Sequence, residues 1–255
     1  MKLSLKASNP FEELDKSQFD ISALDKEIND YLGSFSNESF VVYACDARSL
    51  LLFVERNKFI YKPYMDATKI LPDGRPIYWL TKKIIAKNQE HLTGPVFMMK
   101  VLADAHLKGK RHMFYGGSAD SMDRLKLRCL DDEVNLVYAE SPPFLDLNEL
   151  DVAGVNHKIN YYDIDFFWCG LGAPKQEYLI NQLDRNCRVV MTGVGLAFDY
   201  YAGTVKKPPK IIAALGFEWL VRYVQQPKRI GRFIRPFFYV LKLLISNILF
   251  KDKFS

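Results

Sequence analysis

The sequence has few cysteines, no metal-binding motif and no apolar run long enough to cross a membrane. Its four cysteines are far apart, and no Cys-x-x-Cys or His-paired spacing is present. This pattern excludes a disulfide-stabilised scaffold and gives no sign of a structural zinc site. The N-terminal residues MKLSLKASNPFEELDK contain no apolar stretch of signal-peptide length. We therefore expect a protein that stays in the cytoplasm and keeps its thiols reduced.

The composition is that of an ordinary globular protein. The 255 residues are 49% hydrophobic and 25% charged, which excludes a disordered or collagen-like chain. Positive charge is concentrated at the C-terminal end, where residues 205–255 hold 11 Lys or Arg against 2 Asp or Glu. Residues 1–204 hold 24 basic and 28 acidic residues. The basic segment favours a polyanion as partner: a lipid surface, a nucleic acid or a phosphorylated substrate.

Strand patterns alternate with helical patterns along most of the chain. Short apolar runs rich in β-branched and aromatic residues predict strands, and periodic apolar residues predict helices between them. The strands are expected at 40–44, 69–74, 111–117 and 135–140, and at the start of the segments 165–177 and 187–203. The helices are expected at 46–62, 75–88, 93–109 and 119–131, with Thr93 as N-cap and Gly109 as the end of the third. This alternation predicts an α/β fold with a Rossmann-like parallel sheet flanked by helices.

The basic, proline-rich connector TVKKPPK separates two regions of different character. We place an α/β core at residues 1–204 and a basic amphipathic C-terminal appendage at 205–255. Residues 237–249 have the pattern of an apolar helix with one narrow polar stripe. They are too short and too charged to span a bilayer and favour its interface, although packing on the core or on a partner subunit would leave the same pattern. A nucleic acid is disfavoured, because continuous apolar surface has no use on a phosphate backbone.

Three glycine-rich turns follow predicted strands: Gly116–Gly117, Gly170–Gly172 and Gly193–Gly195. Ligands of open parallel sheets bind at the carboxyl ends of the strands, where glycine lets backbone N–H groups approach a phosphate. A nucleotide or nucleotide-sugar is the natural ligand of such turns. GLGAPK does not complete a dinucleotide fingerprint, and glycines that only allow tight packing remain the alternative.

Four polar side chains beside these strand ends are candidates for the site. Asp73 follows a predicted strand and precedes Gly74, so it is either a general base or part of an ordinary Asp-Gly turn. Gln176, Glu177 and Asp199 could bind ligand hydroxyls or could serve their helices locally. The four histidines have no metal-ligand spacing, and we expect them at the surface.

Arginines precede the apolar helix of the appendage. Arg222, Arg229 and Arg232 would lie near a lipid headgroup plane if that helix enters a membrane interface. Guanidinium groups suit the oxygens of a diphosphate, whereas a solvated face is the alternative.

Taken together, these segments resemble the WecG/TagA/CpsF family of glycosyltransferases, which act in bacterial cell-surface polysaccharide synthesis. The resemblance covers residues 40–235 and rests on motifs in the family's order: LPDG (71–74), TGP (93–95), FYGG (114–117), SPPF (141–144), GLGAPKQE (170–177), GVGLAFDYYAG (193–203) and GFEWLVRYVQQPKRIGR (216–232).

The resemblance implies an inverting glycosyltransferase of exopolysaccharide biosynthesis. The donor would be a UDP-sugar carrying a hexose-type sugar, and the acceptor a sugar on a polyprenyl diphosphate at the cytoplasmic face of the bacterial inner membrane. It implies Asp73 as base, no metal or other cofactor, and diphosphate binding by Arg222, Arg229 and Arg232. The donor would be held by Gly116, Gly117, Gly172, Gln176, Glu177 and Asp199. The appendage would dock a peripheral enzyme on the anionic membrane, and a homo-oligomer is possible.

One stretch departs from the family's pattern. The family has a Thr-x-Asn pair after its first strand, and here the stretch reads Tyr43–Ala44–Cys45–Asp46. A milder departure puts Lys207 and Pro208 where the family often has Arg-Ala. The first departure concerns the identity of the sugars and leaves the reaction class intact. Two other classes stay open: a nucleotide-dependent oxidoreductase, and a non-catalytic adaptor peripheral to the membrane.

Overall fold

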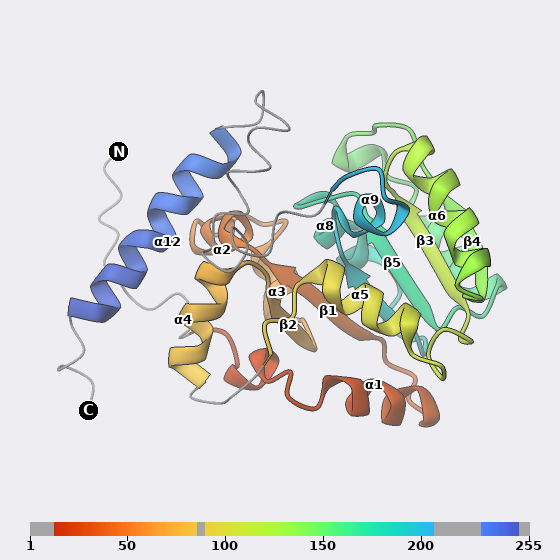
Figure 1. Ribbon diagram of the computed structural model, residues 1–255, viewed down its shortest axis with the longest axis horizontal. Coiled ribbons are helices and arrows are strands. Elements are labelled where there is room, and N and C mark those ends of the chain that lie inside the picture. Colours follow the sequence, from red (N-terminus) through yellow and green to blue (C-terminus); the bar gives the residue numbers. More distant parts are fainter. Residues whose placement is uncertain (1–12, 86–89, 207–230, 250–255) are drawn as a thin grey trace.

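The computed structural model describes residues 13–85, 90–206 and 231–249, and its centre is a six-stranded parallel sheet (Figure 1). The strand order is β2-β1-β6-β5-β3-β4, so all carboxyl ends lie at one edge of the sheet. The bounds are β1 Phe40–Cys45, β2 Lys69–Pro72, β3 His112–Gly116, β4 Leu136–Glu140, β5 Phe166–Gly170 and β6 Val190–Gly193. The six predicted strands and the Rossmann-like arrangement are confirmed.

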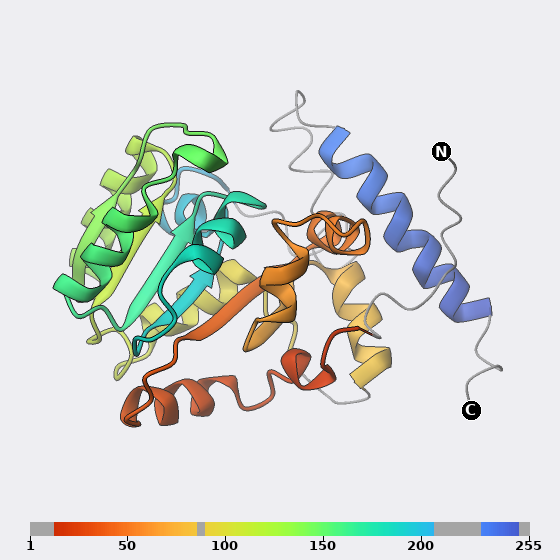
Figure 2. The same ribbon diagram turned by 180° about the vertical axis from the view of Figure 1, so that it is seen from behind.

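Helices cover both faces of the sheet, because alternate strand residues point to opposite faces. Val41 and Tyr43 of β1 enter one apolar core, and Phe40 and Val42 enter the other. One face carries α1 Leu24–Gly33, α5 Gly94–Ala103, α6 Ala119–Asp131 and α9 Ala197–Ala202. The other carries α2 Ala47–Val54, α3 Tyr61–Met65, α7 Val152–Tyr161 and α8 Lys175–Gln182, with η1 Lys16–Phe19, η2 Leu147–Glu149, α4 Arg75–Ile85 and α12 Gly231–Leu249 beside them (Figure 2).

Several predicted helix boundaries are wrong for local reasons. The helix expected over 46–62 is two helices, because Arg56 has a φ of +56°, which an α-helix cannot accommodate. Thr93 is confirmed as the N-cap of α5 and accepts from the Val96 N–H. That helix ends at Ala103, well before Gly109, because Asp104 is extended and its carboxylate caps the following turn. The helical spacing of Ile21, Leu24 and Ile28 predicts helical structure within residues 1–38, and η1 and α1 lie in this segment. Helix α7 and η2 have no counterpart among the predicted elements.

The histidine prediction is wrong for His112, which is fully buried. Its ring stacks on Phe166 with centroids 5.0 Å apart, and Nε2 donates to the Leu107 carbonyl at 2.9 Å. Trp168 Nε1 donates to its Nδ1 at 3.0 Å, and burial lowers the pKa of His112 to about 4. A neutral, fully bonded imidazole therefore belongs to the core.

Helix α12 packs on the α/β core against α2 and α4, as both views show (Figures 1 and 2). Val240 and Leu243 are buried in the same apolar core as α2 and α4, and Arg235 forms an ion pair with Glu55. The described part of the predicted appendage thus covers the core. Whether residues 205–255 form a separable unit stays a prediction.

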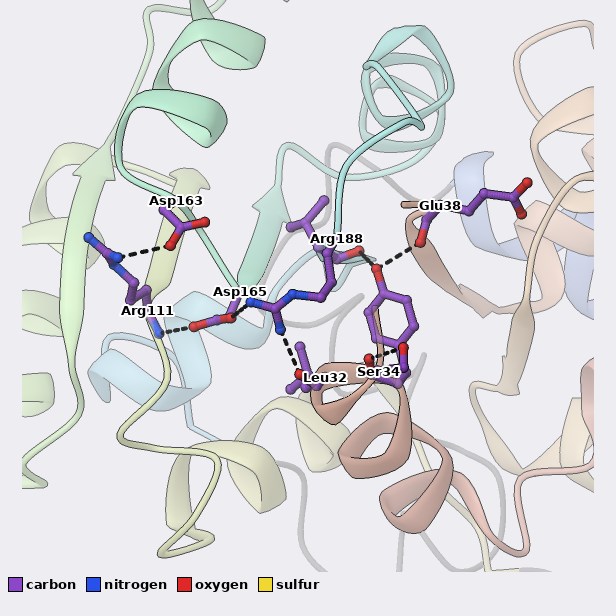
Figure 3. Close-up of polar contacts among 9 residues, drawn as sticks. Leu32, Ser34, Glu38, Arg111, Asp163, Asp165 and Arg188 are labelled. Atoms are coloured by element: carbon purple, nitrogen blue, oxygen red, sulfur yellow. Dashed lines mark hydrogen bonds and ion pairs between the residues drawn. The ribbon is translucent and has the colours of Figure 1, made fainter. Parts of the chain in front are cut away.

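The amino ends of the strands are joined by a network of charged and polar contacts (Figure 3). Asp165 accepts from the Arg111 N–H at 3.0 Å and from Arg188 Nη2 at 3.2 Å. Arg188 Nη1 also donates to the Leu32 carbonyl at 2.7 Å, and Arg111 pairs with Asp163 at 3.0 Å. These contacts tie the starts of β3, β5 and β6 to α1.

Candidate active site

The Asp-Gly turn after β2 lies against the start of α5. The Asp73 N–H donates to the Cys45 carbonyl at 3.0 Å, which anchors the turn to β1, and Gly74 has a φ of +86°. A Cβ atom built on Gly94 would lie 3.2 Å from the Ala44 Cβ and 3.7 Å from Asp73 Oδ2. The fold therefore brings the LPDG and TGP motifs together, and it leaves the Asp73 side chain partly exposed at the carboxyl edge.

The glycines after β3 and β5 are required by close packing. A Cβ on Gly116 would lie 2.7 Å from the Gly170 carbonyl carbon. One on Gly170 would lie 2.5 Å from the Phe198 ring, and one on Gly117 3.2 Å from it. Gly172 differs, because its φ of +78° favours glycine while a Cβ there would meet none of the described residues within 4 Å apart from its chain neighbours. Donor binding by Gly116, Gly117 and Gly172 stays a prediction, and of the three only Gly172 has this open space around it.

Gln176 connects the turn after β6 to Glu177. Its Oε1 accepts from the Gly195 N–H at 3.0 Å, and its Nε2 donates to Glu177 Oε1 at 3.0 Å. Gly193 makes room for this amide, since a Cβ there would lie 2.9 Å from Gln176 Nε2. Gln176 is 4% exposed, so the amide fixes the geometry of the Gly193–Gly195 turn from beneath.

Glu177 is fully buried, and its carboxylate accepts a hydrogen bond from Gln176 instead of facing solvent. Its Oε2 is buried with no hydrogen-bond partner among the described residues. Burial raises its pKa to about 7; the Gln176 hydrogen bond opposes the shift, the Asp46 charge adds to it, and Arg48 weakly opposes it. Its predicted role in donor binding is untested, and its position is that of a group that orients Gln176.

Asp199 joins α9 to α6. It accepts a hydrogen bond from the Ser121 hydroxyl and another from Thr204 Oγ1 at 3.3 Å. Ser118 caps the same end of α6. The carboxylate is half-buried, and its bond to Ser121 links it to the start of α6, which follows the Gly116–Gly117 turn. Its predicted donor contact stays a prediction beside this structural role.

The atypical stretch after β1 divides between the core and the edge. Tyr43 and Cys45 are fully buried, and Tyr43 stacks on Tyr64 with centroids 5.6 Å apart. Ala44 and Asp46 are partly exposed, and Asp46 caps α2 by accepting from the Ser49 N–H at 2.8 Å. Ala44 is therefore the side chain of this stretch that borders the Asp73 turn.

The predicted diphosphate-binding side chains lie outside the part of the appendage that the structure describes. Arg222 and Arg229 lie outside the described residues, and so does the side chain of Arg232. In the described part of α12, four apolar side chains face outward: Ile234, Phe238, Leu241 and Ile245, of which Phe238 is 62% exposed. We call these four the outer stripe of α12.

Two absences among the described residues bear on what the site can hold. No helix in this part of the chain is both long enough and apolar enough to cross a bilayer. Within the same residues, His, Cys, Asp and Glu side chains form no group of three that could hold a metal ion. The expectation of a reaction without a metal stays a prediction.

Sequence reasoning missed two parts of this edge. The closeness of Gly94 to the Asp73 carboxylate was not expected, although the TGP motif in the family resemblance was a signal for it. The second is a cavity lined by Lys58, Lys62 and Lys175. Lys175 belongs to the GLGAPKQE motif, which was a signal for it, whereas Lys58 and Lys62 belong to no motif.

Comparison with known proteins agrees with the motifs. Residues 15–253 match the glycosyl transferase WecG/TagA/CpsF family. Among curated proteins, N-acetylglucosaminyldiphosphoundecaprenol N-acetyl-beta-D-mannosaminyltransferase from Staphylococcus aureus strain MW2 is 25% identical over 167 residues, which is 65% of each chain. The protein of the same name from strain MRSA252 is 26% identical over 170 residues, again 65% of each. The match spans just under two-thirds of the length of these relatives. The extent of the family match shows that the chain belongs to the WecG/TagA/CpsF family of glycosyl transferases.

Proposed function

We propose that this protein transfers a hexose-type sugar from a UDP-sugar to a sugar carried on a polyprenyl diphosphate, with inversion at the anomeric carbon. Family membership supports the reaction class. The names of the relatives describe transfer of N-acetylmannosamine to a sugar linked through diphosphate to undecaprenol. The observation that carries the proposal is the position of Asp73 at the carboxyl edge, against the start of α5.

Asp73 acts as general base in this proposal. The acceptor hydroxyl loses its proton as it attacks the anomeric carbon, and the bond to UDP breaks on the opposite face. A positioned base contributes about 10²–10⁴-fold to such a step. Asp73 is partly exposed and its turn is anchored to β1, so the carboxylate is both accessible and positioned.

The departing UDP develops negative charge that positive groups must stabilise. We assign this role to Arg222, Arg229 and Arg232 of the appendage, on sequence grounds. The start of α5 beside Asp73 supplies a helix N-terminus at the same edge. Because the arginines belong to the appendage, membrane docking would complete the site and limit hydrolysis of the donor.

The outer stripe of α12 supports peripheral attachment to a membrane. Ile234, Phe238, Leu241 and Ile245 recur at intervals of three and four residues, so they share one helix face away from the core. An apolar face beside basic residues is suited to the interface of an anionic bilayer. We place the protein at the cytoplasmic face of the bacterial inner membrane, where its lipid-linked acceptor would be.

The donor sugar is the finer question. Tyr43 and Cys45 are buried, so Ala44 and Asp46 are the members of the atypical stretch able to meet a substrate. A small apolar side chain beside Asp73 offers no hydrogen bond to a sugar. This difference from the family's Thr-x-Asn pair favours a donor or acceptor other than the N-acetylated pair named for the relatives.

A panel of UDP-sugars tests the proposal. Purified full-length protein is mixed with each UDP-sugar and a short-chain prenyl-diphosphate-linked sugar in the presence of anionic vesicles, and UDP release and product mass are measured. Transfer from one UDP-sugar, lost in Asp73→Asn, is expected. Retention of NAD on purification, with no transfer from any UDP-sugar, would instead favour an oxidoreductase.

A further inference from the structure

A large open cavity lies on the α8 side of the sheet, between the α2–α3 connection, η2 and α8. Its volume is about 730 Å³, within the range of about 300–1,000 Å³ that is typical of small-molecule sites. The side chains that α8 contributes recur at three- and four-residue intervals and so share one face of the helix. They include Lys175, Tyr178 and Asn181. None of them belongs to the site predicted from the sequence.

The charge of the lining favours an anion. Lys58 lies in the connection between α2 and α3, Lys62 lies on α3 and Lys175 on α8, and all three line the cavity. Among the described residues, neither Lys58 nor Lys62 forms an ion pair, and Asp146 is the one carboxylate that lines the cavity. Three lysines against one carboxylate give the lining a net positive charge, which a bound anion would neutralise.

Lys175 is held in place at the rim of this cavity. Its ammonium group donates to the Leu145 carbonyl and lies 3.8 Å from the centroid of the Phe144 ring. Both contacts leave further N–H donors on the ammonium group, which carries three. A held cation offers a ligand oxygen a fixed partner and loses less side-chain entropy on binding than a free lysine.

The remaining lining is suited to a sugar. Phe59 and Tyr178 meet edge to face with centroids 5.4 Å apart, and Asn148, Asn181 and Gln182 also line the cavity. Aromatic rings pack on the apolar C–H face of a pyranose, and amides both donate to and accept from hydroxyl groups. The cavity therefore combines groups for a sugar with groups for a phosphate.

We propose that this lysine cavity binds a sugar diphosphate ester, with Lys58, Lys62 and Lys175 on the diphosphate. Pro174 lies in the turn that follows β5 at the carboxyl edge, Lys175 begins α8 directly after it, and both line the cavity. The inference rests on the proposed function, because donor and acceptor in that reaction each carry a sugar on a diphosphate. We assign to the cavity the sugar diphosphate group that donor and acceptor have in common. The experiment below distinguishes the donor from the acceptor.

The experiment measures affinities of the full-length protein for two probes at fixed ionic strength. UDP stands for the donor and farnesyl diphosphate for the lipid carrier, and calorimetry gives each Kd. The variant is Lys58→Gln with Lys62→Gln. Its matched control is Lys26→Gln with Lys126→Gln, two exposed lysines on α1 and α6 that remove the same net charge. Thermal unfolding confirms that both variants fold.

We expect the cavity variant to weaken binding of at least one probe by about tenfold or more, as the loss of charge-assisted contacts predicts, and the control to stay within about twofold. Loss for UDP alone assigns the cavity to the donor, and loss for farnesyl diphosphate alone assigns it to the acceptor. Loss for both assigns it to diphosphate whatever the diphosphate carries. Unchanged affinity for both probes, or an equal loss in the control, overturns the proposal.

Transfer assays separate this proposal from the proposed function. If the wild type transfers sugar and the cavity variant keeps both KM values, the cavity proposal fails and the glycosyltransferase stands. If no UDP-sugar is transferred while the cavity variant alone loses diphosphate affinity, the proposed function fails and the cavity stands.

Discussion

The two edges of the sheet differ in how their buried ionisable groups are bonded. At the amino edge, Asp165 is bonded to Arg111 and Arg188, and the Tyr31 hydroxyl donates to the Glu38 carbonyl at 2.8 Å (Figure 3). Toward the carboxyl edge, the Tyr43 hydroxyl and Glu177 Oε2 are buried with no partner among the described residues. Ser39 Oγ is a similar buried atom at the amino end.

This difference between the edges indicates that the amino edge mainly stabilises the fold, whereas the carboxyl edge carries the groups proposed for the chemistry. Paired charges at the start of the strands hold α1, β3, β5 and β6 in register, whereas the strand ends keep a carboxylic acid inside the protein at a cost. Mutations at the two edges should therefore change the free energy of unfolding in opposite directions and the transfer rate by different amounts. The following expectations run from the largest effect to the smallest.

The largest effect is expected at Asp73. Asp73→Asn keeps the shape of the turn but removes the base, so sugar transfer should fall by about 10²–10⁴-fold. UDP affinity and the unfolding temperature should stay near wild type. The exposed carboxylate Asp30, changed to Asn, is the matched control. A rate above about a tenth of wild type corresponds to less than about 1.4 kcal/mol and would assign the base to another residue.

Glu177→Gln should stabilise the protein at neutral and alkaline pH. The folded-state pKa of Glu177 is raised to about 7 from 4.5, so folding favours the protonated form and stability falls as pH rises from about 4.5 to 7. Above pH 7 the variant should exceed wild type by about 3 kcal/mol, a difference that vanishes towards pH 4.5. Urea unfolding from pH 4.5 to 8.5 measures this. A difference that does not change with pH would contradict it.

Asp165→Ala should destabilise the protein, in contrast to the stabilisation expected for Glu177→Gln. It leaves Arg188 without its carboxylate and the Arg111 N–H without its acceptor, and the expected loss is about 2–3 kcal/mol of unfolding free energy. The loss should be similar at pH 6 and pH 8. Transfer by the folded fraction should be unchanged, because the network lies at the edge away from Asp73. A large fall in the rate per folded molecule would mean that the two edges are coupled.

The smallest effect is expected on the outer stripe of α12. Phe238→Ser removes one exposed apolar side chain and should weaken binding to anionic vesicles by about tenfold, with little change in stability. Leu130→Ser on α6, where Leu130 is 76% exposed, is the matched control. Vesicle co-sedimentation measures both. Equal losses in the two variants would show that the stripe has no special role.

The sequence predicted the strands of the sheet better than it predicted helix breaks and the burial of polar side chains. The six strands were found because apolar β-branched runs ending in Gly, Pro or Asp are strong local signals. The break between α2 and α3 was missed, since the left-handed backbone of Arg56 leaves no mark in side-chain periodicity. Asp73 was predicted at the strand edge, but its closeness to Gly94 depends on how α5 packs against the turn after β2, which local sequence does not show.

The sequence was least able to predict which polar residues are buried. Glu177 follows a glycine turn and has the pattern of a helix N-terminal acid, yet it is fully buried because α8 turns that face onto the sheet. His112 lies close to charged residues in sequence and stacks inside the core. Which face of a helix meets the sheet is decided by tertiary packing, and polar residues carry no signal of it.

The packing position of α12 would affect how the reaction is controlled. Because α12 packs on α2 and α4, the helices that start directly after β1 and β2, a protein held on a bilayer by the outer stripe would keep its reactive edge at a set height above the lipid. The search for the carrier would then run in two dimensions. Turnover would follow the surface density of the carrier among other lipids, and diluting the carrier with inert lipid at constant bulk concentration would slow the enzyme.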